Sequence, residues 1–483
     1  MKKNIAPVAA CASSLPDLWQ HQQATIDAAR DLRSFGLFFE MGAGKTRTAI
    51  ELLKQKDEQV NYRLKTLILC PLIVCENWKR EIERYAPGLA AAYGVEILQG
   101  SAIQRAKQLA ASKSHIYIAN TEILVMHSLW ATLSSHPWDC VVFDESHRFK
   151  DVKATRTRRA TVLADRATYK FILSGSPILK SEADLFCQIR LLSKTLLGDN
   201  YYAFLRAYFR DVNAGNPYKK WPDWKLLPGS LDKIENKIGS ISHRVLKSEV
   251  LDLPPIIRKK VYVSLKGKLA AHYKSLEEEF ITFVETAEGV KAVHASIVLT
   301  KLLRLQQVCS GILATSEGEL LEESPKREAL KHLLEEIASR EKVIVWANFR
   351  ASYREIAEVC DELGLSFVSL TGDQSGAEKQ EAVDAFNTDP RVRVIIANQA
   401  AGGTGIGLQA ASTMIYYSRS YNLEHDLQSE ARAHRGGSEI HQSITRIDIL
   451  TSDTVEEQIV EALERKAGLS EFLKGLITKQ NAA

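Results

Sequence analysis

The sequence has no long apolar run. Among its 483 residues, no continuous hydrophobic segment reaches the roughly 18 residues that suggest a membrane-spanning helix. The N-terminal segment, Met1–Pro16, has no continuous apolar core after its lysines and does not predict a signal peptide. We therefore expect a cytoplasmic protein without a membrane partner, associated with the nucleoid if its source is prokaryotic or viral.

Cysteine is sparse. The chain has seven cysteines, and the closest pair, Cys70 and Cys75, has no histidine or second cysteine pair beside it. This spacing argues against zinc. Reduced thiols and no metal cluster are expected. The sequence also shows no fixed-period repeat and no low-complexity segment.

A strong excess of one charge is missing as well. The net charge is only +4, so a nucleic-acid partner would need local basic patches. One candidate patch is the stretch 201–260, where basic residues outnumber acids, although a solvated helical face has a similar composition. Within it, Trp221 and Trp224 alternate with lysines. They either contact nucleic acid by stacking or anchor a loop against a helical core, and the second interpretation is slightly favoured.

Apolar runs of strand length alternate with helical patterns in two parts of the chain, and the overall composition is that of a soluble globular protein. The runs in the first part are 36–39, 66–70, 115–119, 140–143 and 171–173, and those in the second part are 343–346, 366–370, 392–397 and 414–417. Continuous apolar strands separated by helices predict parallel sheets covered on both faces. We predict an α/β protein whose domains are 1–184 and 325–463, with a mainly helical insertion at 185–324 and a helical tail at 464–483.

A glycine-rich run, Met41-Gly42-Ala43-Gly44-Lys45-Thr46, lies between a predicted strand and a predicted helix. Its backbone can curl tightly and direct amide groups at phosphate oxygens. Lys45 supplies a cation for the β and γ phosphates, and Thr46 supplies a hydroxyl for Mg²⁺. Phe39 stands where the strict pattern has glycine. The run predicts a nucleoside triphosphate site.

Two adjacent carboxylates, Asp144 and Glu145, follow the apolar strand 141–143. The carboxyl edge of a parallel sheet is where ligands bind in α/β folds. Asp144 is expected to hold Mg²⁺ through water, and Glu145 to orient and deprotonate the attacking water. Together with the glycine-rich run, the pair predicts nucleoside triphosphate hydrolysis.

The run Asp144-Glu145-Ser146-His147 resembles the Walker B motif of superfamily-two helicases, the DEAD/DEAH-box kind. Gln22 resembles the glutamine that reads the adenine edge of ATP. Ser174-Gly175-Ser176-Pro177 resembles the motif that couples hydrolysis to domain movement. The resemblance implies coupling roles for Ser174, Ser176, His147 and Gln428.

The second α/β part carries two further motifs. The run Gln399–Leu408 is dense in glycine after a strand and allows close approach of a ligand. In the run Gln428–Gly437, Arg432 and Arg435 lie three residues apart and share one helix face. Two such guanidinium groups facing a cleft could clamp the γ phosphate as arginine fingers.

These two motifs are most similar to those of the Swi/Snf-type DNA translocases. Other segments agree with that family over about 15–463, and they are Pro71-Leu72, Asn77-Trp78, the region from Arg244 to Pro255, and Thr451–Glu456. Departures from the family pattern are Phe39, Ala43, Ser146 and Gly436-Gly437. None of them removes a catalytic group.

The resemblance implies two RecA-like domains in tandem that bind ATP between them, with Gly405 also on the nucleotide. DNA would lie across both domains. Including the two tryptophans above, the residues expected to contact nucleic acid are Asn77, Trp78, Thr121, Trp221, Trp224, Arg350, Thr371, Gly402, Gly403 and Thr404.

The leading hypothesis is an ATP-dependent translocase on duplex or branched DNA that acts in fork or junction remodelling, branch migration, repair or recombination. Nucleosome remodelling is not expected, because no accessory domain is evident in the sequence. The first alternative is a strand-separating helicase on DNA or, less readily, RNA. The second is a nucleic-acid-binding scaffold with a degenerate ATPase site, against which the intact Lys45, Glu145 and Arg435 argue.

Overall fold

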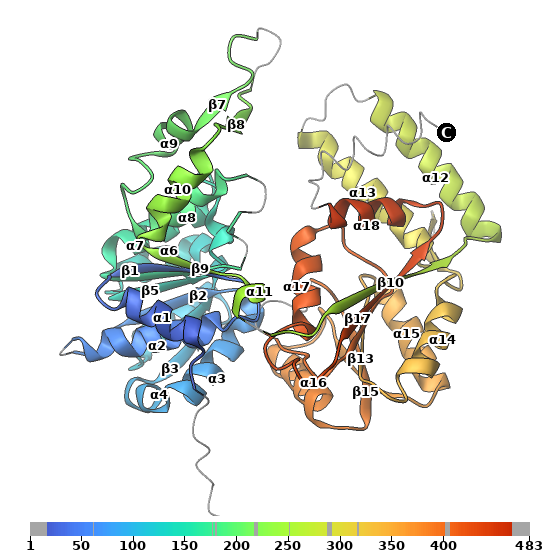
Figure 1. The fold of residues 1–483 in the computed structure, drawn as a ribbon, viewed down its shortest axis with the longest axis horizontal. Helices are drawn as coiled ribbons and strands as arrows, with labels where there is room; N and C mark the ends of the chain where they lie inside the picture. The colour runs from blue at the N-terminus through green and yellow to red at the C-terminus, as the bar shows by residue number, and fades with distance from the viewer. Residues whose placement is uncertain are drawn as a thin grey trace, which may run out of the picture.

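The structure, a computed structural model, consists of two lobes that lie side by side, each built on a parallel sheet (Figure 1). It describes residues 17–60, 62–175, 177–178, 181–216, 221–250, 252–286, 292–315, 318–400 and 406–465. Within these ranges, none of the helices has the length and apolar character needed to cross a membrane.

The first lobe contains a seven-stranded sheet in the order β3-β4-β2-β5-β6-β1-β9. Its strands are β1 (Ser34–Phe39), β2 (Thr66–Cys70), β3 (Val95–Leu98), β4 (Ile116–Asn120), β5 (Cys140–Asp144), β6 (Tyr169–Leu173) and β9 (Ser242–Val245). Alternate residues enter different cores: Leu67 and Leu69 pack on one face of the sheet, and Ile68 and Cys70 pack on the other. Both faces are therefore buried, as the continuous apolar strands predict.

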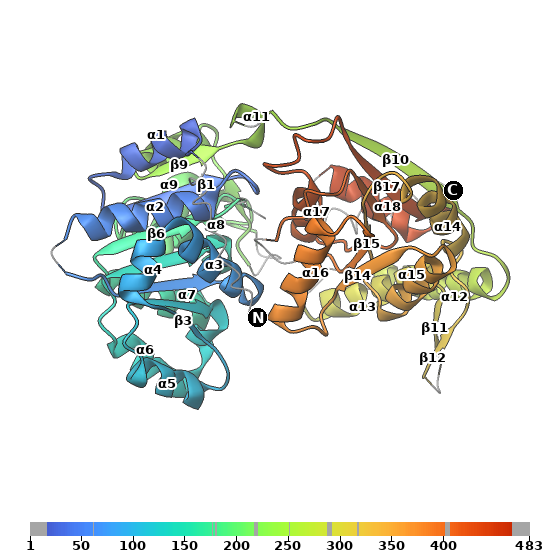
Figure 2. The same cartoon turned by 90° about the horizontal axis from the view of Figure 1, so that it is seen from below.

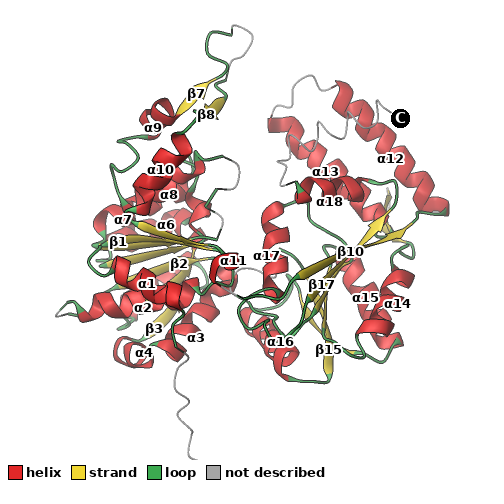
Figure 3. Ribbon diagram, viewed as in Figure 1, coloured by secondary structure: helices red, strands yellow, loops and turns green. Residues whose placement is uncertain are grey.

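Helices cover both faces of this sheet (Figure 3). They are α1 (Gln20–Ala29), α2 (Lys45–Glu58), α3 (Cys75–Tyr85), α4 (Pro87–Tyr93), α5 (Ala102–Ala111), α6 (His127–Ser135), α7 (Thr155–Arg166), α8 (Asp184–Leu192), α9 (Tyr201–Tyr208) and α10 (Ser230–Gly239). A hairpin of β7 (Phe209–Asp211) and β8 (Trp224–Leu226) projects from this lobe (Figure 1).

The second lobe contains a six-stranded sheet in the order β10-β17-β16-β13-β15-β14. Its strands are β10 (Ile256–Val263), β13 (Val343–Trp346), β14 (Ser366–Leu370), β15 (Val392–Ala397), β16 (Thr413–Tyr416) and β17 (Ile444–Thr451), and a separate hairpin is formed by β11 (Ile312–Thr315) and β12 (Gly318–Leu321). The helices after the first lobe are α11 (Lys247–Val250), α12 (Gly267–Thr286), α13 (Ala292–Cys309), α14 (Arg327–Ile337), α15 (Arg350–Glu362), α16 (Gly376–Thr388), α17 (Leu423–Ala433) and α18 (Val455–Glu464). Two sheets of parallel strands confirm the predicted fold class.

The segment 185–324 is not a separate helical unit. Strand β9 pairs with β1 and extends the first sheet, whereas β10 pairs with β17 and extends the second. Helices α8, α9 and α10 contribute to the core of the first lobe, and α13 packs with α18 in the second lobe. The expected boundaries at 184 and 324 therefore do not coincide with the edges of the two sheets. Of the expected C-terminal tail, residues 466–483 lie outside the described ranges.

The two lobes touch at several points. Arg80 on α3 forms an ion pair with Asp384 on α16 (3.5 Å), and Figure 2 shows α16 facing the first lobe beside α3. In the connection between the lobes, the backbone amide of Lys247 donates to Glu40 Oε2 (2.9 Å), and its Nζ donates to the carbonyl of His434 (2.7 Å). The linker thus contacts the entrance of the glycine-rich loop and the end of α17 together.

Candidate nucleotide site and nucleic-acid groove

The glycine-rich loop turns from β1 into α2 at the carboxyl edge of the first sheet. Gly42 and Gly44 have φ values of 87° and 80°, a left-handed conformation that glycine adopts most easily. Lys45 begins α2 and donates from Nζ to the carbonyl of Phe39 (2.8 Å). Burial lowers the pKa of Lys45. Its ammonium group therefore lies at the mouth of the loop, where a phosphate would gain a buried cation.

The acidic pair lies at the end of β5. Asp144 Oδ2 accepts a hydrogen bond from Trp78 Nε1 (2.9 Å), and its Oδ1 accepts one from the Glu145 amide (2.9 Å). Burial, together with the charge of Glu145, raises the pKa of Asp144 to about 6. Glu145 has a φ of 50°, a strained conformation for a residue with a side chain and one that concentrates at functional sites. The carboxylate of Asp144 and the hydroxyl of Thr46 line the same cleft. Both offer hard oxygen donors, which suit a divalent cation, so this donor set fits Mg²⁺.

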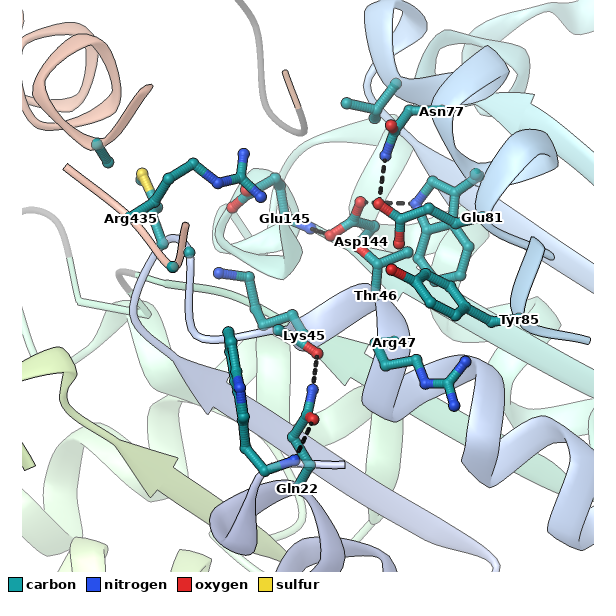
Figure 4. Close-up of a pocket in the computed structure, with 18 of the residues that line it drawn as sticks. Gln22, Lys45, Thr46, Arg47, Asn77, Glu81, Tyr85, Asp144, Glu145 and Arg435 are labelled. Atoms are coloured by element: carbon teal, nitrogen blue, oxygen red, sulfur yellow. Dashed lines mark hydrogen bonds between the residues drawn. The ribbon is translucent and has the colours of Figure 1, made fainter. Parts of the chain in front are cut away.

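A cleft of about 300 Å³ joins the two lobes at this point. The first lobe lines it with Gln22, Met41, Gly42, Gly44, Lys45, Thr46, Asp144 and Glu145, and the second with Arg432 and Arg435. Figure 4 shows Arg435 reaching toward Glu145 from the second lobe. Ala43, within the loop, is buried, and Gly405 lies outside the described residues.

The two arginines share one hydrogen-bond acceptor. Arg432 Nη1 and Arg435 Nη1 both donate to the carbonyl of Ile406 (3.1 Å each). Arg432 Nε and Nη2 are buried and have no hydrogen-bond partner among the described residues. Burial, reinforced by the charge of Arg435, lowers the pKa of Arg432 to about 9. Buried guanidinium donors without acceptors are costly, and an anion in the cleft would satisfy them.

The cleft also contains residues that the sequence did not single out. Trp19 lies beside Gln22, whose side chain accepts from the Trp19 amide (2.9 Å) and donates to the Gly44 carbonyl (3.1 Å). Arg47 stacks on the ring of Tyr85, with 4.2 Å from the guanidinium to the ring centroid. Arg47 directly follows Lys45-Thr46 and could have been found from that position. Tyr85 lies 38 residues after Arg47, and only the packing of α3 brings it to the cleft.

The residues expected to couple the lobes lie on both sides of the interface. His147 Nδ1 is 3.3 Å from Glu145 Oε2, and His147 Nε2 is 3.0 Å from Glu424 Oε1 on α17. Gln428 Nε2 also donates to Glu424 Oε1 (2.9 Å). Ser174 Oγ lies 3.4 Å from His147 Nδ1, and Ser176 lies outside the described residues.

A second and larger cavity, of about 1400 Å³, also lies between the lobes, and we call it the groove. Its basic lining residues are Arg148, Lys150 and Arg156 from the first lobe and Lys379 from the second. None of these four was selected from the sequence, although Arg148, Lys150 and Arg156 belong to a basic stretch at 148–159 that could have pointed to them. Glu145 lines both this groove and the nucleotide cleft.

Several residues expected to contact nucleic acid lie elsewhere. Trp78 is only 1% exposed and bonds to Asp144, so its ring is not free to stack on a base. Asn77 lines the nucleotide cleft and donates to Glu81. Trp78 thus supports Asp144, whereas Asn77, in the same first part of α3, lines the nucleotide cleft rather than the groove.

The remaining candidates divide by exposure. Thr121 is buried next to the groove-lining Asn120, and Thr371 precedes the groove-lining Gly372, whereas Arg350 is exposed and forms an ion pair with Asp373. Trp221 is 81% exposed near the end of the β7–β8 hairpin, and Trp224 packs against the core of the first lobe. In the part of the chain that the structure describes, neither tryptophan lines the groove. Gly402, Gly403 and Thr404 lie outside the described residues.

Two parallel α/β lobes with a phosphate-binding loop on one and paired arginines on the other define a helicase-like ATPase core. The model of the SNF2-related domain matches residues 25–312, and that of the helicase conserved C-terminal domain matches residues 325–437. The chain belongs to the SNF2-related family.

Curated relatives are similar along most of the chain. Chromodomain-helicase-DNA-binding protein 1-like of Mus musculus is 28% identical over 90% of this chain and 47% of its own length. The putative ATP-dependent helicase/translocase YwqA of Bacillus subtilis is 26% identical over 89% of this chain and 45% of its own length. The chain thus spans less than half the length of these relatives.

Among solved structures, the Sulfolobus solfataricus SWI2/SNF2 ATPase core in complex with dsDNA is 23% identical, with a TM-score of 0.43. The match covers 95% of this chain and 92% of the Sulfolobus chain.

Proposed function

We propose that the protein hydrolyses ATP in the cleft between its lobes and uses the energy to move along duplex or branched DNA. The observation that carries the proposal is Arg432, whose Nε and Nη2 are buried without a partner among the described residues and which lines the cleft opposite Lys45. A triphosphate in this cleft would pair with cations from both lobes at once. Its hydrolysis would then alter how the lobes hold each other.

The residues of the cleft divide the chemistry among them. Lys45 binds the β and γ phosphates, and Glu145 orients water and accepts its proton. Arg432 and Arg435 stabilise the charge that develops on the transferred phosphoryl group. Thr46 and Asp144 would hold Mg²⁺, which neutralises phosphate charge when bound. Trp78, through its hydrogen bond to Asp144, fixes the direction of that carboxylate.

Support for DNA as the partner comes from the larger groove. Four basic and five acidic side chains line it, and the basic ones come from both lobes, so a phosphate backbone lying in it would find cations on both. The family and the relatives named above, which include a helicase/translocase, support the same partner. Contacts with phosphates carry no base information. Binding should therefore tolerate any sequence and weaken as salt rises.

Movement without strand separation is the form of activity that we propose. It would serve fork or junction remodelling, branch migration, repair or recombination. In the described ranges, no aromatic side chain other than the ring of His147 or His425 lines the groove, so no stacking wedge stands in the path of a duplex. One observation favours the alternative of a strand-separating helicase: Trp221 is 81% exposed on a hairpin that projects from the first lobe.

The test is the rate of ATP hydrolysis with no nucleic acid and with duplex, single-stranded, forked and four-way DNA, or RNA. Duplex or branched DNA should stimulate the wild-type protein most. Arg435→Ala should lower turnover about 10³-fold while leaving DNA affinity nearly unchanged, because Arg435 lines the cleft and not the groove. An equal loss of DNA binding would instead place Arg435 on the nucleic acid, and absence of stimulation by any substrate would reject the proposed function.

A further inference from the structure

Two buried thiols lie in contact in the first lobe, beside the groove. Cys70 ends β2 and Cys75 begins α3, and their Sγ atoms are 3.5 Å apart. Each thiol also donates weakly to one backbone carbonyl, Cys75 to that of Pro71 (3.7 Å) and Cys70 to that of Ala119 (3.9 Å). The nearest partner of each sulfur is therefore the other sulfur.

The contact is close to the geometry of a disulfide. Bonded sulfur atoms are about 2.05 Å apart, so an approach of about 1.5 Å would join the pair. Cys70 is held in place, because β2 pairs with β4 on one side and with β5 on the other. Cys75 follows a short 3-10 turn (Leu72–Val74) and lies in the first turn of α3. The start of α3 is therefore the part that would move.

The two thiols differ in their access to the groove. Cys75 is only 3% exposed but lines the groove, whereas Cys70 is completely buried and does not line it. Burial raises the pKa of the Cys70 thiol, which makes Cys70 slow to react with an oxidant. A small oxidant that enters the groove therefore meets Cys75 first, with Cys70 behind it. A reachable thiol next to a second cysteine is the arrangement of redox-sensing pairs.

We propose that Cys70 and Cys75 form a reversible modification site, at which a peroxide converts the two thiols into a disulfide that slows ATP hydrolysis. In the first step the O–O bond of hydrogen peroxide breaks, Cys75 Sγ gains a hydroxyl group, and one water leaves. In the second step Cys70 Sγ attacks Cys75 Sγ, the S–O bond breaks, and the hydroxyl leaves as water with the thiol proton of Cys70. The thiol pair loses two electrons, and the peroxide gains them. A thiol reductant reverses the change by thiol–disulfide exchange.

The effect on hydrolysis rests on the proposed function and passes through α3. Trp78 follows Cys75 by one turn of this helix and donates to Asp144 (2.9 Å). Asn77 and Glu81 of the same helix line the nucleotide cleft. A misplacement of about 1 Å costs up to about 100-fold in rate. Movement of the start of α3 toward Cys70 should therefore slow hydrolysis about tenfold or more.

The test treats the reduced protein with hydrogen peroxide and follows two quantities. Mass spectrometry of the peptide that contains Cys70 and Cys75 should show the loss of two hydrogen atoms, which dithiothreitol restores. Phosphate release from ATP without DNA should fall about tenfold or more on oxidation and should recover with dithiothreitol. Each rate is divided by the rate of the same protein before oxidation, so that variants with different starting rates are comparable.

Three variants assign the effect to this pair. Cys75→Ser removes the thiol that meets the oxidant, so the reversible inhibition should disappear. Cys70→Ser removes the second thiol, so Cys75 should remain a sulfenic acid that dimedone labels. Cys360→Ser is the matched control and should retain the full response of the wild type. Cys360 is as buried as Cys70 but belongs to the core of the second lobe, and it lines neither the groove nor the nucleotide cleft.

The outcomes separate this inference from the proposed function. The inference is wrong if peroxide leaves both thiols free, if it joins either of them to a different cysteine, or if the disulfide forms and the rate stays the same. If the reduced wild type hydrolyses ATP but no nucleic acid stimulates it, the proposed function fails, whereas reversible inhibition of that hydrolysis still supports the inference. Absence of ATP hydrolysis under every condition would overturn both.

Discussion

Arg435 of the second lobe lies against Gly42 of the phosphate-binding loop in the first lobe. A Cβ atom built on Gly42 would lie only 2.6 Å from Arg435 Cβ, and the φ of Gly42 is +87°. Both the conformation and the close approach require glycine here. The contact places an arginine of one lobe directly over the loop that would bind the phosphates on the other.

Gly42→Ala should therefore impair catalysis more than folding. The left-handed conformation costs a residue with a side chain about 1–2 kcal/mol of stability. The displaced Arg435 should lower ATP turnover about 100-fold, the loss typical of a misplacement of about 1 Å. Gly88→Ala is the control, because Gly88 has open space around its Cβ position. Equal turnover in the two variants, measured by phosphate release, would contradict the contact.

Lys45 and Glu145 should fail in different ways. Lys45→Ala should abolish hydrolysis and weaken ATP binding, since the loop loses its phosphate cation. Glu145→Gln should retain ATP binding and lose about 10²–10⁴-fold in turnover, because the amide cannot accept a proton. Binding of a fluorescent ATP analogue and phosphate release measure the two effects separately. Near wild-type hydrolysis by Glu145→Gln would show that a group other than Glu145 is the base.

Trp78→Phe should raise the Mg²⁺ concentration needed for half-maximal hydrolysis about tenfold or more. The change removes the indole donor to Asp144 and retains an aromatic ring in the core, and loss of such an orienting group typically lowers metal affinity by 10–100-fold. Trp138→Phe is matched to it, because Trp138 donates to a backbone carbonyl elsewhere in the same lobe. The Mg²⁺ requirement should not move in that control. An unchanged Mg²⁺ requirement in Trp78→Phe would show that Asp144 does not hold the metal.

The pairing of His147 predicts a pH dependence. Its pKa is about 9 in the folded chain and 6.5 ordinarily, so its contribution to stability is fully present below about 6.5 and is lost as pH rises through about 9. Glu145 and Glu424 face the ring directly, with Arg148 and His425 near Glu424 and Lys45 near Glu145. The thermal stability of the protein should therefore fall as pH passes about 9 and His147 loses its proton.

Glu424→Gln should move that fall to lower pH, because the variant removes one of the two carboxylates that raise the pKa of His147. His147→Ala should abolish it. Thermal unfolding of the three proteins, followed against pH, tests this. Superimposable profiles would show that the titration of His147 does not contribute to stability.

The sequence was sufficient for the fold class and for most of the strands. The runs 343–346, 366–370 and 392–397 match β13, β14 and β15, because each is continuously apolar or bounded by clear turns. The sequence did not predict strands β10 and β17. In β10, Arg258, Lys259 and Lys260 interrupt the apolar pattern at an exposed sheet edge, and pairing with a distant strand stabilises them as a strand.

The nucleotide cleft was more predictable than the groove. Lys45, Asp144 and Arg435 each lie within a short sequence motif, so neighbouring residues were enough to predict them. The groove depends instead on how the two lobes bring together side chains from distant segments, as with Arg148 and Lys379. Glu424 had no motif of its own, and its contact with His147 joins residues 277 positions apart, which tertiary packing alone determines.

We expect that hydrolysis drives movement along DNA without separating its strands. This expectation is tested most directly by comparing, at equal ATP consumption, displacement of a triplex-forming third strand or movement of a four-way junction with unwinding of a plain tailed duplex. Melting costs about 1.4 kcal/mol per base-pair step, whereas junction movement forms one pair for each pair broken. We expect third-strand displacement or junction movement that Glu145→Gln abolishes, and poor unwinding of the tailed duplex. Efficient unwinding of a long tailed duplex without junction movement would contradict it and would favour a strand-separating role for the hairpin that carries Trp221.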